Sequence, residues 1–161
     1  MTTSEYNQCV DRHADGVYRF VLKNLRDEDK ARDVVQDSFE KMWMKLDEID
    51  GAKARSYLFT TAYHTMIDYL RRERFSAAMN EAAHNEHSYT DGYSDLKEVL
   101  EEAVARLPDI QRSVVLLRDY EGYSYQEIGE VTGLSESQVK VYIYRARIAL
   151  KNYIGSLDAV I

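Results

Sequence analysis

A stretch in the C-terminal third of the chain places small, polar and capping residues at intervals that suit contact with DNA. Ser124 can cap a short helix, and Glu127, three positions later, can complete a capping box. Gly129 is small enough for a second helix to cross closely, and Gly133 can take the left-handed backbone of a tight turn. Ser135 can then cap a second helix. These intervals predict a helix-turn-helix, whose second helix enters the major groove.

The outward face of this second helix combines short polar side chains with basic ones. Polar groups near the helix N-terminus suit base edges, and later basic groups suit phosphates. Residues 137–151 hold four basic side chains and no acidic one, a net charge of +4. The candidate DNA contacts are Ser135, Glu136, Ser137, Lys140, Val141, Tyr144, Arg145 and Arg147. An ordinary helical hairpin with a solvated basic face is the alternative.

Other kinds of site lack the residues that they need. Cys9 is the one cysteine, so neither an intrachain disulfide nor a cysteine-based zinc site is expected. His84 and His87 stand in a polar stretch without further ligands, and no metal site is expected there. The sequence contains no glycine-rich phosphate loop and no nucleophile motif. We therefore expect no enzymatic activity and no cofactor.

Apolar residues at helical spacing define the elements that must position these side chains. Three amphipathic helices are expected in the N-terminal half, the second beginning near Asp27 and stopping near Gly51. The helical period then disappears over residues 76–95. One proline and seven glycines are few for a sheet-rich chain of 161 residues. The sequence predicts an all-α fold of two small helical domains, 1–75 and 96–161, joined by a flexible acidic linker.

Charge and hydropathy narrow the class of protein further. The net charge is −7, but residues 51–80 carry +3 and residues 81–102 carry −6, so an acidic stretch separates two basic ones. No apolar run approaches the roughly 18 residues needed to span a bilayer. The N-terminal residues do not form a secretory signal. We expect a cytoplasmic protein with no stable membrane insertion.

Three segments, in order along the chain, resemble a known family. Residues 33–43, DVVQDSFEKMW, resemble the polymerase-binding helix (region 2.2) of bacterial sigma factors of the extracytoplasmic-function (ECF) class of the sigma-70 family. Residues 56–72 resemble the promoter −10 helix of that class, regions 2.3–2.4. Residues 107–147, with the helix-turn-helix, resemble its region 4. The resemblance covers about 10–75 and 98–152, with the acidic linker between them as in the family.

The resemblance implies that one face of the 33–43 helix docks on the clamp helices of the polymerase β′ subunit. Charged side chains at such a rim set register, and Trp43 would be an aromatic anchor. The implied polymerase-binding residues are Asp33, Gln36, Asp37, Glu40 and Trp43. The residues alone also allow a solvated face, with Trp43 in the core. The β subunit is a further expected contact.

The resemblance also implies that the third helix and the loop before it bind and open −10 DNA, while the helix-turn-helix binds −35 DNA. Capturing an unpaired base and stacking others on aromatic side chains can drive opening, each stack contributing about 1–3 kcal/mol. The implied −10 residues are Lys53, Arg55, Ser56, Tyr57, Thr60, Thr61, His64, Asp68, Arg71, Arg72 and Arg74. Core packing is the alternative for Tyr57 and Tyr63.

Together these features predict an ECF-type sigma factor that binds core RNA polymerase, recognises the −35 and −10 promoter elements and promotes DNA opening. The family implies an anti-sigma factor, and the free protein is expected to be a monomer. The acidic linker would either mimic nucleic acid in the polymerase channel or act as a spacer. A stand-alone helix-turn-helix regulator with a helical sensing or dimerisation domain is the alternative. A helical adaptor without a DNA role is the third possibility.

Overall fold

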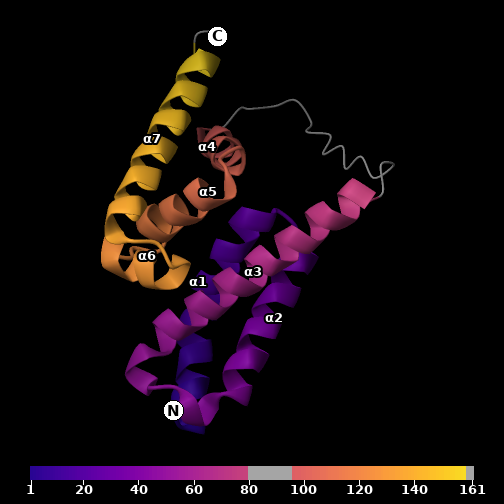
Figure 1. The fold of residues 1–161 in the computed structure, drawn as a ribbon, viewed down its shortest axis with the longest axis vertical. Helices are drawn as coiled ribbons and strands as arrows, with labels where there is room; N and C mark the ends of the chain where they lie inside the picture. The colour runs from indigo at the N-terminus through magenta and orange to yellow at the C-terminus, as the bar shows by residue number, and fades with distance from the viewer. Residues whose placement is uncertain (80–95, 159–161) are drawn as a thin grey trace.

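The computed structural model describes residues 1–79 and 96–158, and within these ranges the chain is helical and contains no strand. The first lobe consists of α1 (Thr3–Leu25), α2 (Glu28–Met44) and α3 (Ala54–Met79), with the short turns η1 (Leu46–Glu48) and η2 (Gly51–Lys53) before α3. The second lobe consists of α4 (Leu96–Ala105), α5 (Asp109–Val115), a π-helical segment η3 (Leu116–Tyr120), α6 (Tyr125–Thr132) and α7 (Glu136–Asp158). Figure 1 shows the two lobes side by side, with α1 and α3 facing the second lobe.

Local capping chemistry sets where the helices begin. The Thr2 side chain and Glu5 form a reciprocal capping box at the start of α1. Asp27 caps α2 by accepting a hydrogen bond from the Lys30 backbone N–H at 3.1 Å, as its position before an acidic first turn predicts. In α1, the chain leaves the helix through Arg26, which has a φ of 56°.

The predicted helix-turn-helix is present, with both of its caps. The Glu127 N–H donates to Ser124 Oγ at 3.1 Å, and the Ser124 N–H donates to Glu127 Oε1 at 3.0 Å. Gly133 has a φ of +79°, the left-handed conformation expected of the turn. Ser135 and Gln138 then repeat the reciprocal capping at the start of α7, at 2.9 and 3.2 Å.

Gly129 is required for a close approach, although the partner differs from the predicted one. A Cβ at this position would lie 2.7 Å from the backbone oxygen of Leu134. The contact is therefore with the turn itself rather than with the second helix. The turn can fold back against α6 only because residue 129 has no side chain.

Two helices end at places other than those predicted. α2 ends at Met44, and two short 3-10 turns occupy the chain up to α3. α3 continues to Met79, four residues past the predicted end of the first domain at residue 75, because the Ser-Ala-Ala-Met sequence there contains good helix formers. The rest of the predicted linker, with His84 and His87, lies outside the described residues.

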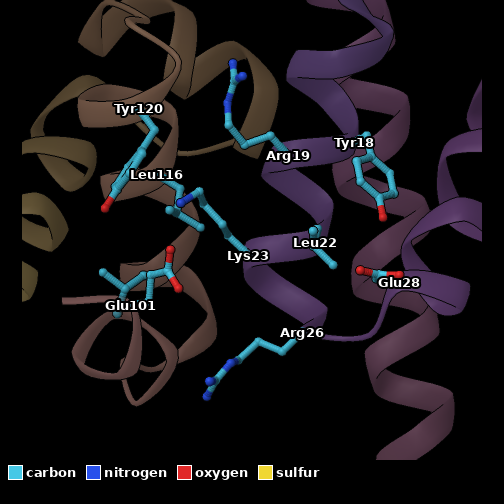
Figure 2. Close-up of a pocket in the computed structure, with 10 residues that line it drawn as sticks. Tyr18, Arg19, Leu22, Lys23, Arg26, Glu28, Glu101, Leu116 and Tyr120 are labelled. Carbon is cyan, nitrogen blue, oxygen red and sulfur yellow. The ribbon is translucent and has the colours of Figure 1, made fainter. Parts of the chain in front are cut away.

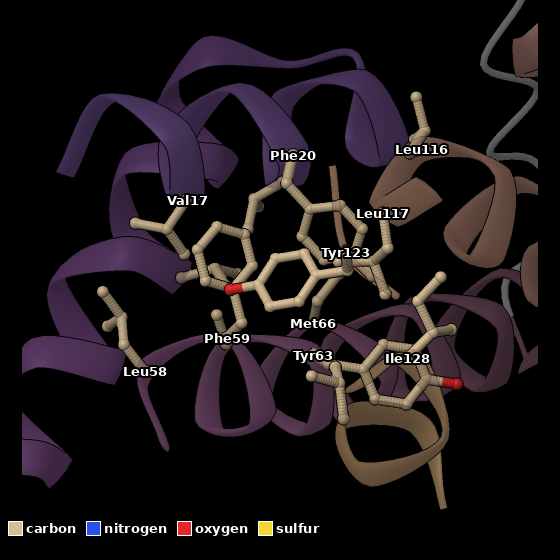
Figure 3. Packing of buried hydrophobic residues seen from close by; sticks show 14 of the residues in the cluster. Val17, Phe20, Leu58, Phe59, Tyr63, Met66, Leu116, Leu117, Tyr123 and Ile128 are labelled. Atoms are coloured by element: carbon tan, nitrogen blue, oxygen red, sulfur yellow. The ribbon is translucent and has the colours of Figure 1, made fainter. Parts of the chain in front are cut away.

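The two lobes share one hydrophobic core. Tyr123, in the turn before α6, is fully buried and packs against Phe59 of α3, with ring centroids 5.2 Å apart. Phe59 in turn contacts Phe20 of α1, at 5.9 Å. Figure 3 shows the Tyr123 ring lying between side chains of the first lobe, with Ile128 beside Tyr63. The sequence did not predict this packing between lobes.

A buried polar cluster joins the same lobes. Arg112 of α5 is 6% exposed, and its guanidinium donates to Asn24 Oδ1 of α1 at 2.9 Å, to the Leu107 carbonyl at 3.1 Å and to Asp109 Oδ1 at 2.8 Å. The Ser113 hydroxyl also donates to Asn24 Oδ1, at 3.3 Å. Because a buried charge is costly unless it is paired and hydrogen-bonded, this cluster restricts how α5 can lie on α1.

We expect Gly129→Ala to destabilise the protein by about 1–3 kcal/mol, because the added Cβ meets a backbone oxygen that cannot move aside cheaply. Gly155→Ala is the matched control, since a Cβ there has no neighbour within 4 Å on the exposed part of α7. Chemical denaturation monitored by circular dichroism would measure both. Equal stability of the two variants would contradict this account of Gly129.

The Tyr123 hydroxyl gives a pH-dependent prediction. It has no hydrogen-bond partner among the described residues, and burial raises the pKa of Tyr123 well above its usual value. In the unfolded chain the phenol ionises near its ordinary pKa of about 10, so the folded state loses stability as the pH rises past that value. Tyr123→Phe should lose less stability between about pH 8 and about pH 10.5. Thermal melts of both proteins would measure the difference, and parallel declines would contradict the prediction.

Candidate nucleic-acid and protein interfaces

All eight residues predicted to contact −35 DNA are exposed at the N-terminal half of α7 or at its cap. Lys140 Nζ lies 3.7 Å from Glu136 Oε1, one turn earlier on the same helix. Arg147 Nη2 lies 2.8 Å from Asp119 Oδ1 of η3, and this hydrogen bond raises the pKa of Arg147. Arg147 would therefore exchange an existing ion pair for a phosphate.

Exposed apolar side chains continue the same face of α7. Val141 is 44% exposed and Tyr144 is 67% exposed, as the DNA interpretation requires of them. Ile148, 42% exposed and one turn further on, extends the row and was not among the predicted contacts. Ile148 follows Tyr144 by four residues, and this helical spacing could have placed it on the same face from the sequence.

Most of the residues predicted to contact −10 DNA lie along one side of α3. Residues three or four apart share a side of a helix, and this series keeps that spacing over several turns. The residues on this side are Tyr57, Thr60, Thr61, His64, Asp68, Arg71 and Arg72, all half-buried or exposed. Lys53 is exposed in η2 just before the helix, and Ser56 is half-buried in its first turn.

Arg55 and Arg74 do not join that side, because they point toward the second lobe. The Arg55 guanidinium lies 4.0 Å from the centre of the Tyr123 ring, and its Nη2 donates to the Glu121 carbonyl at 2.9 Å. Arg74 forms an ion pair with Asp109. Tyr63 is buried on this inner side of α3, in agreement with the core-packing alternative for that residue.

The five residues predicted to bind polymerase are all exposed on one face of α2. Trp43 is 49% exposed and packs edge-on against Tyr6 of α1, with centroids 5.0 Å apart, so it is not a core residue. A shallow groove of about 660 Å³ runs beside it between α1 and α2. Tyr6, Val10, Phe39 and Met44 also line this groove. The sequence did not assign these four residues to the site, because their apolar types fit the core as well.

A second hollow, of about 470 Å³, lies between the lobes (Figure 2). Lys23 of α1 reaches across it and lies 4.2 Å from the centre of the Tyr120 ring. Arg26 Nη1 lies 3.0 Å from Glu102 Oε2 of α4. The hollow exists only because the lobes pack together, so sequence patterns within either lobe could not indicate it.

The described ranges contain no cluster of three or more potential metal ligands. No helix in those ranges is long and apolar enough to cross a bilayer. Cys9 is buried on α1, as expected of a small core residue.

Comparisons with known proteins agree with both lobes. The family model for sigma-70 region 2 matches residues 9–76, and the model for sigma-70 region 4 matches residues 97–150. The ECF RNA polymerase sigma factor SigL of Mycobacterium tuberculosis (strain H37Rv) is 32% identical over 151 residues, which are 88% of this chain and 84% of SigL. The chain belongs to the ECF RNA polymerase sigma factors.

Solved structures of sigma factors share the fold. The sigma factor RpoE of Bartonella quintana, in complex with the anti-sigma factor NepR, superimposes with a TM-score of 0.82 at 22% identity, over 95% of this chain and 98% of RpoE. CnrH, in complex with the cytosolic domain of CnrY, superimposes with a TM-score of 0.71 at 26% identity, over 94% of this chain and 88% of CnrH.

As a sigma factor, the chain initiates transcription by binding core RNA polymerase and promoter DNA, and it is not an enzyme. The predicted function and the all-α fold are thereby confirmed. The region 2 match accounts for the first lobe, so neither a sensing or dimerisation domain nor an adaptor role is needed to explain it.

Trp43→Ala in this sigma factor should weaken binding to core polymerase by about 2 kcal/mol, roughly 30-fold in Kd, because exposed aromatic anchors dominate protein interfaces. Fluorescence anisotropy with labelled sigma factor and purified core enzyme would measure this change. Glu28→Ala, at an exposed position in the first turn of α2 outside the proposed face, is the control and should bind normally. An unchanged Kd for Trp43→Ala would remove Trp43 from the interface.

Proposed function

We propose that residues 1–75 form the region 2 domain, residues 76–95 the linker and residues 96–161 the region 4 domain. The supporting observation is that the two family matches, 9–76 and 97–150, fall on the two helical lobes in this order. In this division the first lobe binds polymerase and −10 DNA, and the second lobe binds −35 DNA. The protein acts in the cytoplasm, where bacterial promoters and polymerase are found.

The N-terminal half of α7 is the −35 recognition surface. Its capped start holds Ser135, Glu136 and Ser137 at the end that would enter the major groove. Lys140, Val141, Tyr144, Arg145 and Arg147 follow on the exposed side. The polar residues contact base edges, and the basic residues hold phosphates on either side of the groove.

The outer side of α3 and the loop before it form the −10 surface. Tyr57 offers a partly exposed ring for stacking, and Thr60, Thr61, His64 and Asp68 offer hydrogen-bonding groups along the same side. Arg71 and Arg72 hold phosphates at its far end, with Lys53 at its beginning. Arg55 and Arg74 join this surface only when the lobes separate, because both contact the second lobe in the packed state.

The exposed face of α2 is the polymerase surface. Asp33, Gln36, Asp37 and Glu40 provide its charged and polar rim, and Trp43 provides an apolar anchor beside the groove. The β′ clamp helices are the proposed partner of this face, and the β subunit is a further proposed contact of the chain.

We also infer that an anti-sigma factor holds the free protein, which is otherwise a monomer. The support is that the related RpoE structure is a complex with an anti-sigma factor. Such a partner inhibits by keeping the lobes away from the positions that they take on polymerase.

Transcription in vitro on fragmented genomic DNA, with purified core polymerase and sequencing of transcript 5′ ends, tests the assignment. Adding this chain should produce new start sites that share two separated upstream elements. Lys140→Glu with Arg145→Glu should abolish these starts, because reversed charges repel the phosphates beside the −35 element.

Lys151→Glu is the matched control for that experiment, because Lys151 is exposed on α7 but lies outside the proposed recognition surface. It should leave the start sites in place. Starts that survive the double reversal would show that α7 does not read −35 DNA.

A further inference from the structure

A basic cavity of about 420 Å³ lies at the boundary of the lobes, and Arg55 is the only one of its lining residues that the proposed −10 surface includes. Arg12, His13 and Arg19 of α1 line it, together with Arg55 at the start of α3. Asp15 is the only acidic group of the first lobe among the described lining residues. Three guanidinium groups from the first lobe therefore face one carboxylate.

The second lobe inserts a carboxylate into this cavity. The Glu121 side chain is 4% exposed, and its two oxygens accept hydrogen bonds from Arg19 Nε and Nη2, both at 2.8 Å. Arg55 donates to the backbone oxygen of the same residue at 2.9 Å. Gly16 leaves room for the carboxylate, since a Cβ there would lie 3.1 Å from Glu121 Oε1.

The geometry around Glu121 is one that also suits a phosphate. A guanidinium binds carboxylate and phosphate oxygens through the same pair of parallel N–H groups. Burial lowers the pKa of the neighbouring His13, and the charges of Arg55 and Arg12 lower it further, so both guanidinium groups act on this part of the cavity. When Glu121 is withdrawn, Arg19 loses its paired carboxylate and Arg55 loses its carbonyl acceptor, and Asp15 is then the one carboxylate left among the described lining residues.

The position of the cavity indicates which phosphate would enter. Arg55 stands next to Ser56 and Lys53, at the end of α3 where the proposed −10 surface begins. A strand that follows the outer side of α3 would therefore reach the cavity at its end. The backbone of single-stranded DNA carries the required phosphates at regular intervals.

We propose that Arg12, Arg19 and Arg55 form a binding site for a backbone phosphate of single-stranded promoter DNA, and that Glu121 occupies this site while the lobes are packed. The proposal rests on the assignment of the first lobe to −10 DNA. In the packed state Glu121 competes with DNA, so lobe packing and strand capture oppose one another.

Binding of fluorescein-labelled oligothymidylate to the full chain, followed by anisotropy, tests the competition. Glu121→Ala should bind about tenfold more tightly than the wild type, because the competing carboxylate is gone. Glu130→Ala is the matched control, since it removes the same charge from an exposed position on α6 and should change little. Equal affinities of the two variants would overturn the proposal.

Variants in the Glu121→Ala background test the site itself. Adding Arg19→Gln or Arg12→Gln should reverse the gain and reduce the slope of log K against log salt by about 0.7, the value for one phosphate contact on a single strand. Arg32→Gln, on the exposed side of α2, should leave both unchanged. An unchanged salt slope for both cavity variants would overturn the site. Because Arg12 is exposed and makes no contact that the fold needs, its variant keeps the test valid if Arg19→Gln unfolds.

Arg71→Gln with Arg72→Gln separates this proposal from the function on which it rests. If those two changes weaken oligothymidylate binding while the cavity variants do not, the α3 surface stands and the cavity site is wrong. If the cavity variants weaken binding and the α3 variants do not, the cavity site is supported, and Arg71 and Arg72 do not belong to the −10 surface.

Discussion

The burial of Tyr123 against Phe59 and Phe20 is the contact on which the packed arrangement of the two lobes depends. Aromatic side chains bury large areas, and paired rings add a preferred geometry to that burial. The phenol ring is inserted into the first lobe from a turn, so the elements on either side of the turn, η3 and α6, are brought down onto α1 and α3 with it (Figure 3). Its hydroxyl gains no described hydrogen bond in return, so apolar contact and the Arg55 guanidinium over the ring hold it there.

Polar contacts around this apolar centre then specify the orientation of the lobes. The Arg112 cluster lies on one side of it, and the Arg19–Glu121 pair lies on another. Both include groups from each lobe, and a rotation of one lobe would separate Arg112 from Asn24 and the buried Glu121 carboxylate from Arg19. As a result, the two sides of α3 have different environments. Its inner side is covered by α1, α2 and the second lobe, and its outer side stays open.

The sequence predicted well what short-range chemistry controls. The caps at Ser124 and Ser135, the left-handed Gly133 and the exposed face of α7 all depend on residues a few positions apart, and they appear as expected. The placement of Arg55 could not be predicted in this way, because its partner Glu121 is 66 residues distant. A basic residue beside a helix start fits DNA binding and an internal contact equally well. Trp43 shows the same limit, since its exposure depends on where Tyr6 of another helix lies.

The π-helical geometry of η3 has a mechanical consequence for the packed state. A π-helical turn holds a surplus residue compared with an α-helical one, and each residue of an α-helix turns the chain by about 100°. Glu121 and Tyr123 follow η3 directly, so the direction in which both side chains leave the second lobe depends on that surplus. With one residue fewer in this segment, the Glu121 carboxylate and the Tyr123 ring would point in a different direction around the helix axis, away from α1. The one extra residue of η3 thus sets the rotation at which the second lobe packs against the first.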